Sequence, residues 1–291
     1  MSDAPFSLVL AGGGARGFAH VGVLRALERR GLAPAALVGV SMGAVVAATY
    51  ALREDWYAAL LAMDTRAFPR PLRHPGGRPR WPWERVLPFL AYFHAGVDMF
   101  LGWGLGQHAL RAGQAMLADL TRGRNLEDGR LPVAVCATDL RSGSRAVLRR
   151  GRAAQAVYAS SALAGILPPL EHEGALLSDG AYADLVPIDV AREFGHPVVV
   201  AVDPGQRLET GEVRNGFQAL ARAVEICHLQ HAHLRFAGAD VVLRPAFRRL
   251  IDTLEFGGRR ECVAAGARAV RAAFPRLRAL LAGASTIRAA Q

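Results

Sequence analysis

A serine flanked by glycines lies at residues 39–43, where the sequence reads GVSMG. The apolar run ALVGV leads up to Ser41 and a helical pattern follows it, so the serine is expected at a turn from a strand into a helix. In that setting G-x-S-x-G is typical of a nucleophile elbow, because Gly39 and Gly43 relieve crowding at a sharp turn that leaves the hydroxyl exposed. The competing interpretation is a serine that only caps the helix. The strand-turn-helix context favours a catalytic Ser41.

A glycine-rich turn, GGGARG at residues 12–17, also follows an expected strand and precedes an expected helix. The backbone N–H groups of such a loop, beside the positive end of a helix dipole, suit a phosphate or an oxyanion. A dinucleotide site would need an acidic residue about 20 residues further on, at the end of the second strand. That strand ends instead at Val40 and Ser41, and Glu28 lies within the helix pattern. The loop is therefore expected to face Ser41 as an oxyanion hole.

A nucleophilic serine needs a neighbouring group that takes its proton. The chain has nine histidines (His20, His74, His94, His108, His172, His196, His228, His231 and His233). An α/β-hydrolase would have its catalytic histidine late in the chain, after an acidic residue, and only the last four satisfy that order. None of those four is expected in a loop after a strand. Asp179 differs, because it ends the run ALLSD at a turn made with Gly180. Four rival carboxylates stay open, although Asp189 is expected near a helix start and Asp203 before a Pro-Gly turn (Asp139, Asp184, Asp189 and Asp203).

Three segments in this order, GGGARGFAHVGVLRALE, GVSMGA and SDGAYADLVP, resemble the patatin-like phospholipase family, particularly its short bacterial members. The resemblance runs from residue 6 to about 275, apart from 64–104, and includes ASSALAGILPPL, where Ala164 stands in place of a proline that the family often has. It implies a Ser–Asp dyad without a histidine, with Ser41 as the nucleophile and Asp179 as the base. The oxyanion loop that it implies comprises Gly12, Gly13, Gly14, Arg16 and Gly17, with the amides of Gly13 and Gly14 foremost and that of Arg16 as a further candidate. No metal or cofactor is implied.

The positioning elements are expected from short apolar runs that alternate with helical patterns. Strands are expected at 7–14, 36–41, 131–140, 144–150, 174–182, 197–205 and 239–245, and helices at 17–30, 42–53, 152–165 and 188–195, followed by Arg-rich helices. This alternation predicts an α/β fold with three α/β/α layers and a mostly parallel central sheet. Because neither a repeat nor a linker-like stretch is evident, residues 1–291 are expected to form a single domain.

Residues 64–104 interrupt the pattern and are interpreted as an insertion. The first part is rich in Pro and Arg, and residues 81–103 hold seven aromatic side chains (Trp81, Trp83, Phe89, Tyr92, Phe93, Phe100 and Trp103). One interpretation is a lid or an interfacial patch, because Trp and Tyr favour the lipid–water boundary and the flanking arginines favour anionic headgroups. The other is an extra helical hairpin that fills its own small core.

Composition restricts the other possibilities. Apolar residues make up 52% and charged residues 21% of the chain, as in ordinary globular proteins. All 35 basic residues are Arg and the net charge is +10, but no basic block accompanies it, so nucleic-acid binding is not expected. Cys136, Cys227 and Cys262 are too widely spaced for a disulfide framework or a zinc cluster. Without a signal-peptide pattern or a membrane-spanning run, the chain is expected to be cytoplasmic, with any membrane contact peripheral.

The leading hypothesis is a serine acyl hydrolase that acts on lipid esters, as a phospholipase A, lysophospholipase or carboxylesterase. An acyltransferase would use the same residues and differ only in the acceptor. A non-catalytic regulatory module on a hydrolase scaffold is disfavoured, because Ser41, Asp179 and the glycine loop are all present. The oligomeric state and the preferred acyl chain and headgroup are not set by these motifs.

Overall fold

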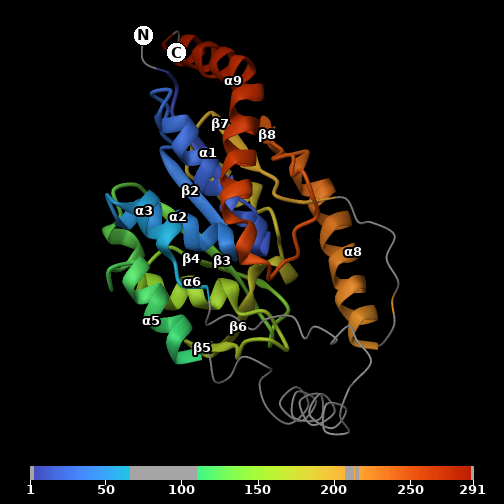
Figure 1. Cartoon of the computed structure of the whole chain (residues 1–291). Coiled ribbons are helices and arrows are strands. Elements are labelled where there is room, and N and C mark those ends of the chain that lie inside the picture. The colour runs from blue at the N-terminus through green and yellow to red at the C-terminus, as the bar shows by residue number, and fades with distance from the viewer. Residues whose placement is uncertain (1–2, 66–109, 207–212, 214–215, 290–291) are drawn as a thin grey trace, which may run out of the picture.

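An eight-stranded sheet runs through the part of the chain that the computed structural model describes, which is residues 3–65, 110–206, 213 and 216–289 (Figure 1). The strands follow the order β5-β6-β3-β2-β1-β7-β8, and β4 pairs with β3. Their bounds are β1 Phe6–Leu10, β2 Ala36–Val40, β3 Val133–Asp139, β4 Arg145–Leu148, β5 Leu170–His172, β6 Ala175–Asp179, β7 Val198–Val202 and β8 Val241–Leu243. The pairs β1–β2, β1–β7, β2–β3 and β7–β8 are parallel, and β3–β4, β3–β6 and β5–β6 are antiparallel.

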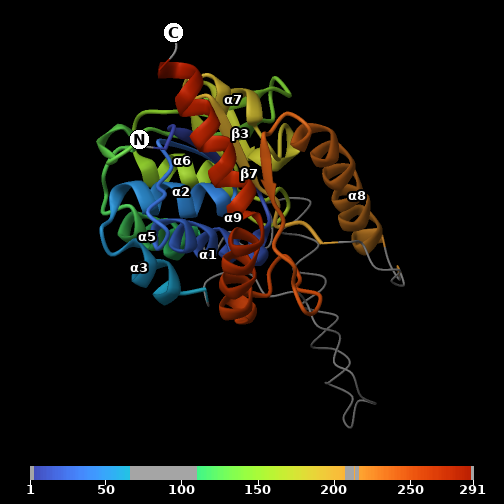
Figure 2. The ribbon, with the colours of Figure 1, turned by 90° about the horizontal axis from the view of Figure 1, so that it is seen from above.

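Helices cover both faces of this sheet. Their bounds are α1 Phe18–Glu28, α2 Met42–Leu52, α3 Trp56–Ala62, α5 Leu110–Leu120, α6 Ala153–Ser161, α7 Ile188–Arg192, α8 Gly216–Phe236 and α9 Arg259–Ala289, with 3₁₀ turns at Gly14–Gly17, Leu126–Asp128, Gly180–Tyr182 and Phe256–Gly258. One apolar core joins the sheet to α1, α2, α3, α5, α6 and α9, and a second joins its other face to α7 and α8. Seen from above, α8 stands across the sheet from α1 and α2 (Figure 2). The expected three-layer architecture with a mixed, mostly parallel sheet is confirmed.

The central strands form because continuous apolar runs can be buried on both faces of a parallel sheet. All five residues of β1, β2 and β7 are buried. The helix expected over 152–165 is shorter, because α6 ends at Ser161 and the carbonyl of Ala162 accepts hydrogen bonds from the Asp179 amide and the Ser178 hydroxyl. The helix expected over 188–195 is likewise cut to Ile188–Arg192. β5, α3 and α5 were not expected individually.

The register of β3 brings the ends of β2 and β6 together. Val40, the last residue of β2, pairs with Cys136, and Asp179, the last residue of β6, pairs with the next residue, Ala137. Because β4 occupies the opposite edge of β3 over the same residues, β2 and β6 lie end to end along one edge. The residue after Val40 is Ser41, so the sheet itself sets Ser41 beside Asp179.

Candidate active site

Ser41 lies at a strained turn between β2 and α2. Its backbone has φ 53° and ψ −125°, a conformation that an L-residue adopts only when the surroundings impose it. Gly43 is required on the helix side, because a Cβ there would lie 2.0 Å from the carbonyl oxygen of Leu10. A Cβ at Gly39 would lie 2.5 Å from the Cα atom of Ala44. Both flanking glycines therefore permit the sharp turn, as expected for a nucleophile elbow.

The Ser41 hydroxyl donates a hydrogen bond to Asp179. The distance from Ser41 Oγ to Asp179 Oδ2 is 2.7 Å, and Asp179 Oδ1 accepts the amide N–H of Ala181 at 2.9 Å. The turn after Asp179 requires Gly180, because a Cβ there would lie 2.1 Å from the carbonyl oxygen of Cys136. Both carboxylate oxygens are thus held, and one of them is aimed at the serine.

Burial changes the basicity of Asp179. The side chain is buried, and loss of solvation raises its pKa from 3.8 to about 6, although the hydrogen bonds from the Ala181 amide and the Ser41 hydroxyl oppose this rise. A carboxylate with this pKa is a stronger base than an exposed aspartate and is still mostly ionised at neutral pH. The arrangement is therefore suited to taking a proton from a hydroxyl without a histidine.

Two further hydroxyls hydrogen-bond to the backbone of Ser41 and Asp179, and neither was expected from the sequence. Ser160 Oγ accepts the Ser41 amide at 2.9 Å and donates to the carbonyl of Cys136 at 2.6 Å. Thr138 Oγ1 donates to the carbonyl of Asp179 at 2.8 Å. Ser160 lies within ASSALAGILPPL, which was noted only as part of the family resemblance. No local pattern marks either contact, because each joins residues that are far apart in the chain.

The glycine loop packs against the elbow and leaves two amides available. The Gly12 amide donates to Leu185 and the Arg16 amide to Gly13, whereas the amides of Gly13 and Gly14 donate to no described residue. A Cβ at Gly12 would lie 3.6 Å from Ser41 Cβ, so the loop adjoins Ser41. Gly14 has φ +52°, and a Cβ there would lie 2.3 Å from the carbonyl oxygen of Thr253, so the position requires a glycine. Among the expected oxyanion donors the geometry thus favours Gly13 and Gly14 over Arg16.

Arg16 and Gly17 attach the glycine loop to neighbouring parts of the fold. The Arg16 guanidinium is largely buried, which lowers its pKa, and its Nη1 donates to the carbonyl of Ile251 at 3.1 Å. A Cβ at Gly17 would lie 2.6 Å from Met42 Cγ, on the first residue of α2. The side chain of Arg16 therefore fixes the loop to the 250–256 region rather than pointing at Ser41.

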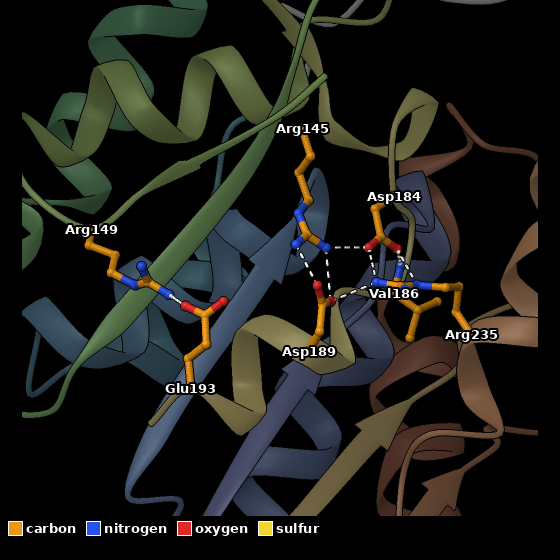
Figure 3. A network of polar contacts seen from close by, with 7 residues as sticks. All are labelled: Arg145, Arg149, Asp184, Val186, Asp189, Glu193 and Arg235. Carbon is orange, nitrogen blue, oxygen red and sulfur yellow. Dashed lines mark hydrogen bonds and ion pairs between the residues drawn. The ribbon is translucent and has the colours of Figure 1, made fainter. Parts of the chain in front are cut away.

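The rival carboxylates are engaged elsewhere. Asp139 accepts hydrogen bonds from Ser142, Leu176 and Arg141, which lower its pKa to about 2. Asp203 accepts the Gly205 amide at 2.9 Å, as expected for a turn. Asp184 and Asp189 are paired with arginines (Figure 3). Within the described residues, Asp179 is the carboxylate that bonds the serine.

Among the described residues, the Ser41 hydroxyl hydrogen-bonds to Asp179 and to no histidine. His20 lies inside the fold with Nε2 2.8 Å from the carbonyl oxygen of Ala11, and burial lowers its pKa to about 4. His196 hydrogen-bonds Ser7 at 2.9 Å, and the His228 ring lies 5.5 Å from that of Tyr182. His74 and His94 fall outside the described residues, as does His108.

An apolar cavity opens beside Ser41. It lies between α2, α5 and α6, and the segments around 163–167 and 254–256 close it. Its lining is overwhelmingly apolar and includes both Ser41 and Gly14 (Gly14, Ser41, Met42, Val45, Leu110, Gly113, Met116, Leu117, Tyr158, Ser161, Leu163, Ile166, Leu167, Leu254 and Phe256). A cavity of this kind suits a hydrocarbon chain with its reactive end at the serine.

Some expectations fall outside the described residues or concern other kinds of site. The insertion expected at 64–104, interpreted as a lid or a hairpin, lies almost wholly within 66–109, which is not described. Among described residues no cluster of His, Cys, Asp or Glu could hold a metal ion. No helix in the described ranges is long and apolar enough to cross a membrane.

Comparison with known proteins identifies relatives over most of the chain. The family described as patatin-like phospholipase matches residues 8–192. Patatin-like phospholipase domain-containing protein 7 of Rattus norvegicus is 30% identical over 245 residues, which are 79% of this chain and 17% of that protein. Lysophospholipase NTE1 of Cryptococcus neoformans is 35% identical over 198 residues, 68% of this chain and 11% of the relative. The chain thus spans less than a fifth of the length of these relatives.

A solved structure, VipD from Legionella pneumophila, is 12% identical with a TM-score of 0.43 and covers 92% of this chain and 67% of that one. A likeness at this level carries no functional information.

Proposed function

Since the chain belongs to the patatin-like phospholipase family, we propose that it is a serine acyl hydrolase of lipid esters, with Ser41 as nucleophile and Asp179 as base. The observation that carries the proposal is the 2.7 Å hydrogen bond from Ser41 Oγ to Asp179 Oδ2. Ser41 lies at a strained turn between β2 and α2, and it lines the apolar cavity. In an acyl transfer the hydrogen bond would activate the hydroxyl, the turn would expose it, and the cavity would bind the acyl chain.

The first half of the reaction forms an acyl-enzyme. Asp179 takes the proton of the Ser41 hydroxyl while Oγ bonds to the ester carbonyl carbon, and the carbonyl oxygen becomes an oxyanion. The amides of Gly13 and Gly14 are the donors proposed to stabilise that oxyanion, and a single donor of this kind contributes about 10²- to 10³-fold. When the tetrahedral intermediate collapses, the C–O bond to the alcohol breaks and the alcohol leaves with the proton that Asp179 holds.

The second half repeats these steps with water. Asp179 takes a proton from a water molecule, whose oxygen bonds to the acyl carbon. Collapse then breaks the bond to Ser41 Oγ, which recovers the proton and releases a free carboxylic acid. This cycle uses groups of the chain and water alone.

The apolar cavity supports a lipid ester as the substrate class. An acyl chain among side chains such as Val45, Met116 and Leu117 would leave water, which favours binding by about 0.8 kcal/mol for each methylene buried. One relative carries the name lysophospholipase, which supports a phospholipid with a single acyl chain as the first substrate to test.

A fluorophosphonate probe tests the proposal. It phosphonylates an activated serine, so the wild-type protein is expected to carry one label on the peptide that contains Ser41, and Ser41→Ala is expected to carry none. Asp179→Asn should slow labelling and ester hydrolysis by about 10²- to 10⁴-fold, the usual contribution of a general base. The far-ultraviolet circular dichroism of all three proteins should agree. Near-normal hydrolysis by purified Ser41→Ala would reject the mechanism.

The identity of the product separates hydrolysis from transfer. With lysophospholipid as the only lipid, a hydrolase releases one free fatty acid for each headgroup-bearing alcohol. If the acyl group appears instead on a second lipid or an added alcohol, the same residues serve an acyltransferase.

A further inference from the structure

One short segment connects the two halves of the proposed active centre. Residues 180–186 follow Asp179 directly, and the Asp184 amide donates back to the carbonyl of Gly180 at 2.9 Å. At the other end of the segment, the carbonyl of Leu185 accepts the Gly12 amide at 3.4 Å. Interactions that fix the 180–186 segment therefore fix both the turn after Asp179 and the glycine loop at residues 12–17.

A cluster of four charged side chains holds this segment through Asp184. Arg145 Nη1, on β4, donates to Asp184 Oδ2 at 2.6 Å, and Arg235, on α8, donates to both oxygens of the same carboxylate (Figure 3). Both arginines also donate to Asp189 on α7, from Arg145 Nη2 at 2.6 Å and from Arg235 Nη2 at 2.6 Å. The Asp184 side chain is only 5% exposed.

The internal bonds of the segment depend on the same carboxylate. Asp184 Oδ1 accepts the Val186 amide at 3.0 Å, which closes a turn just before α7. Burying a charged carboxylate at this depth is costly unless charged groups hydrogen-bond to it, and the partners of Asp184 come from β4 and α8. Asp184 therefore cannot shift without leaving two guanidinium groups short of an acceptor. A displacement of about 1 Å near a reacting group can cost about 10²-fold in rate.

We propose that Asp184 is a positioning residue. Clamped between Arg145 and Arg235, it fixes the 180–186 segment and, through it, the direction of the Asp179 carboxylate and the placement of the Gly12 end of the oxyanion loop. Asp184 itself hydrogen-bonds neither Ser41 nor Asp179 through its side chain, and it is not among the residues that line the cavity. The proposal rests on the proposed function.

Asp184→Asn tests the proposal in the full-length protein. The variant keeps an oxygen for the Val186 amide and loses the charge that binds the two arginines. With a water-soluble p-nitrophenyl ester we expect kcat to fall 10- to 100-fold and KM to stay within threefold, because the cavity is unchanged. The rate of fluorophosphonate labelling should fall by a similar factor. A purely structural role would lower the unfolding temperature without this selective loss of kcat.

The structure offers a matched control and a milder variant. Arg149→Gln removes the ion pair with Glu193, which likewise joins the chain after β4 to the chain after α7 (Figure 3). In the described structure neither of these side chains forms a hydrogen bond or ion pair with residues 180–186. Its kcat should stay within twofold of wild type. Arg235→Gln leaves Asp184 paired with Arg145, and its kcat should fall 3- to 10-fold.

The possible outcomes lead to different conclusions. A folded Asp184→Asn protein with kcat within threefold of wild type overturns the positioning role. If that variant does not fold, Arg235→Gln decides at a temperature well below its unfolding midpoint, where an unchanged kcat overturns the role and a selective kcat loss supports it. If the wild-type protein is not labelled at Ser41, the proposed function fails and the positioning role fails with it. Labelling of the wild type with no effect of Asp184→Asn overturns the positioning role alone.

Discussion

At the scale of single residues, the burial of Asp179 predicts a pH-dependent rate. The pKa of this carboxyl is raised to about 6 by loss of solvation, and only the ionised form can accept the Ser41 proton. We therefore expect kcat/KM for a p-nitrophenyl ester to be level above about pH 7 and to fall tenfold for each pH unit below about 6. Rates measured between pH 4.5 and 8.5 check this. A midpoint near 4, the value of an exposed aspartate, would contradict the effect of burial.

The same burial predicts that the ionised side chain of Asp179 lowers the stability of the folded protein. Because the pKa of Asp179 is higher in the folded than in the unfolded state, folded chains bind more protons between about pH 4 and 6, and stability falls as the pH rises through this window. In Asp179→Asn, the side-chain oxygen can accept the Ala181 amide and the nitrogen can donate to Ser41 Oγ. The variant should therefore gain up to about 3 kcal/mol in the free energy of unfolding at pH 8.

Urea denaturation at two pH values measures this gain. The difference between Asp179→Asn and the wild type should be largest at pH 8 and shrink toward zero near pH 4, where the wild-type carboxyl is also neutral. Ser41→Ala, which keeps the buried carboxylate, serves as the control. An Asn variant that is less stable than wild type at pH 8 would show that the charged form is favoured in the fold.

At the scale of elements, the elbow depends on a close approach between α2 and β1. A methyl group at Gly43 would meet the carbonyl oxygen of Leu10 at 2.0 Å, and backbone cannot yield as a flexible side chain does. Gly43→Ala should therefore lower the free energy of unfolding by at least about 2 kcal/mol and abolish labelling of Ser41. Gly283→Ala, inside α9 with open space around it, should instead raise stability by about 1 kcal/mol. Thermal unfolding of the two variants compares them, and similar midpoints would refute the close-packing argument.

The elements also show how far the sequence alone could lead. Ser41 and the glycine loop were identifiable because strand, turn and helix signals are local, and the structure places both at such turns. Asp179 needed the family resemblance, since Asp139 and Asp203 also stand at the ends of expected strands. The pairing of Cys136 with Val40 and of Ala137 with Asp179 is what singles it out. Register of this kind, like the hydrogen bonds from the Ser41 amide to Ser160 and from Arg145 to Asp184, depends on residues more than 30 positions apart.

At the scale of the whole molecule, the described chain is organised around one sheet. The family match ends at residue 192, but the fold continues beyond it. β7 and β8 extend the same sheet, and α9 packs on the same apolar core. α9 lies along α1, so elements from both ends of the described chain are joined (Figure 1). This continuity supports the proposal of a single domain.

The net charge makes a prediction about lipid surfaces. The excess of 35 arginines over 25 acidic residues leaves +10, which should attract the protein to anionic headgroups. We propose that the contact is peripheral and electrostatic, so binding should weaken as salt shortens the screening length from about 10 Å at 0.1 M to about 3 Å at 1 M. Ser41→Ala is the form to use, because it would leave the vesicle lipids intact. Sedimentation with phosphatidylglycerol vesicles should pull down a fraction that falls several-fold between 0.05 and 0.5 M NaCl, and phosphatidylcholine vesicles should bind little at either concentration. Equal binding to both lipids at both salt concentrations would mean that apolar side chains, and not the charge, make the contact.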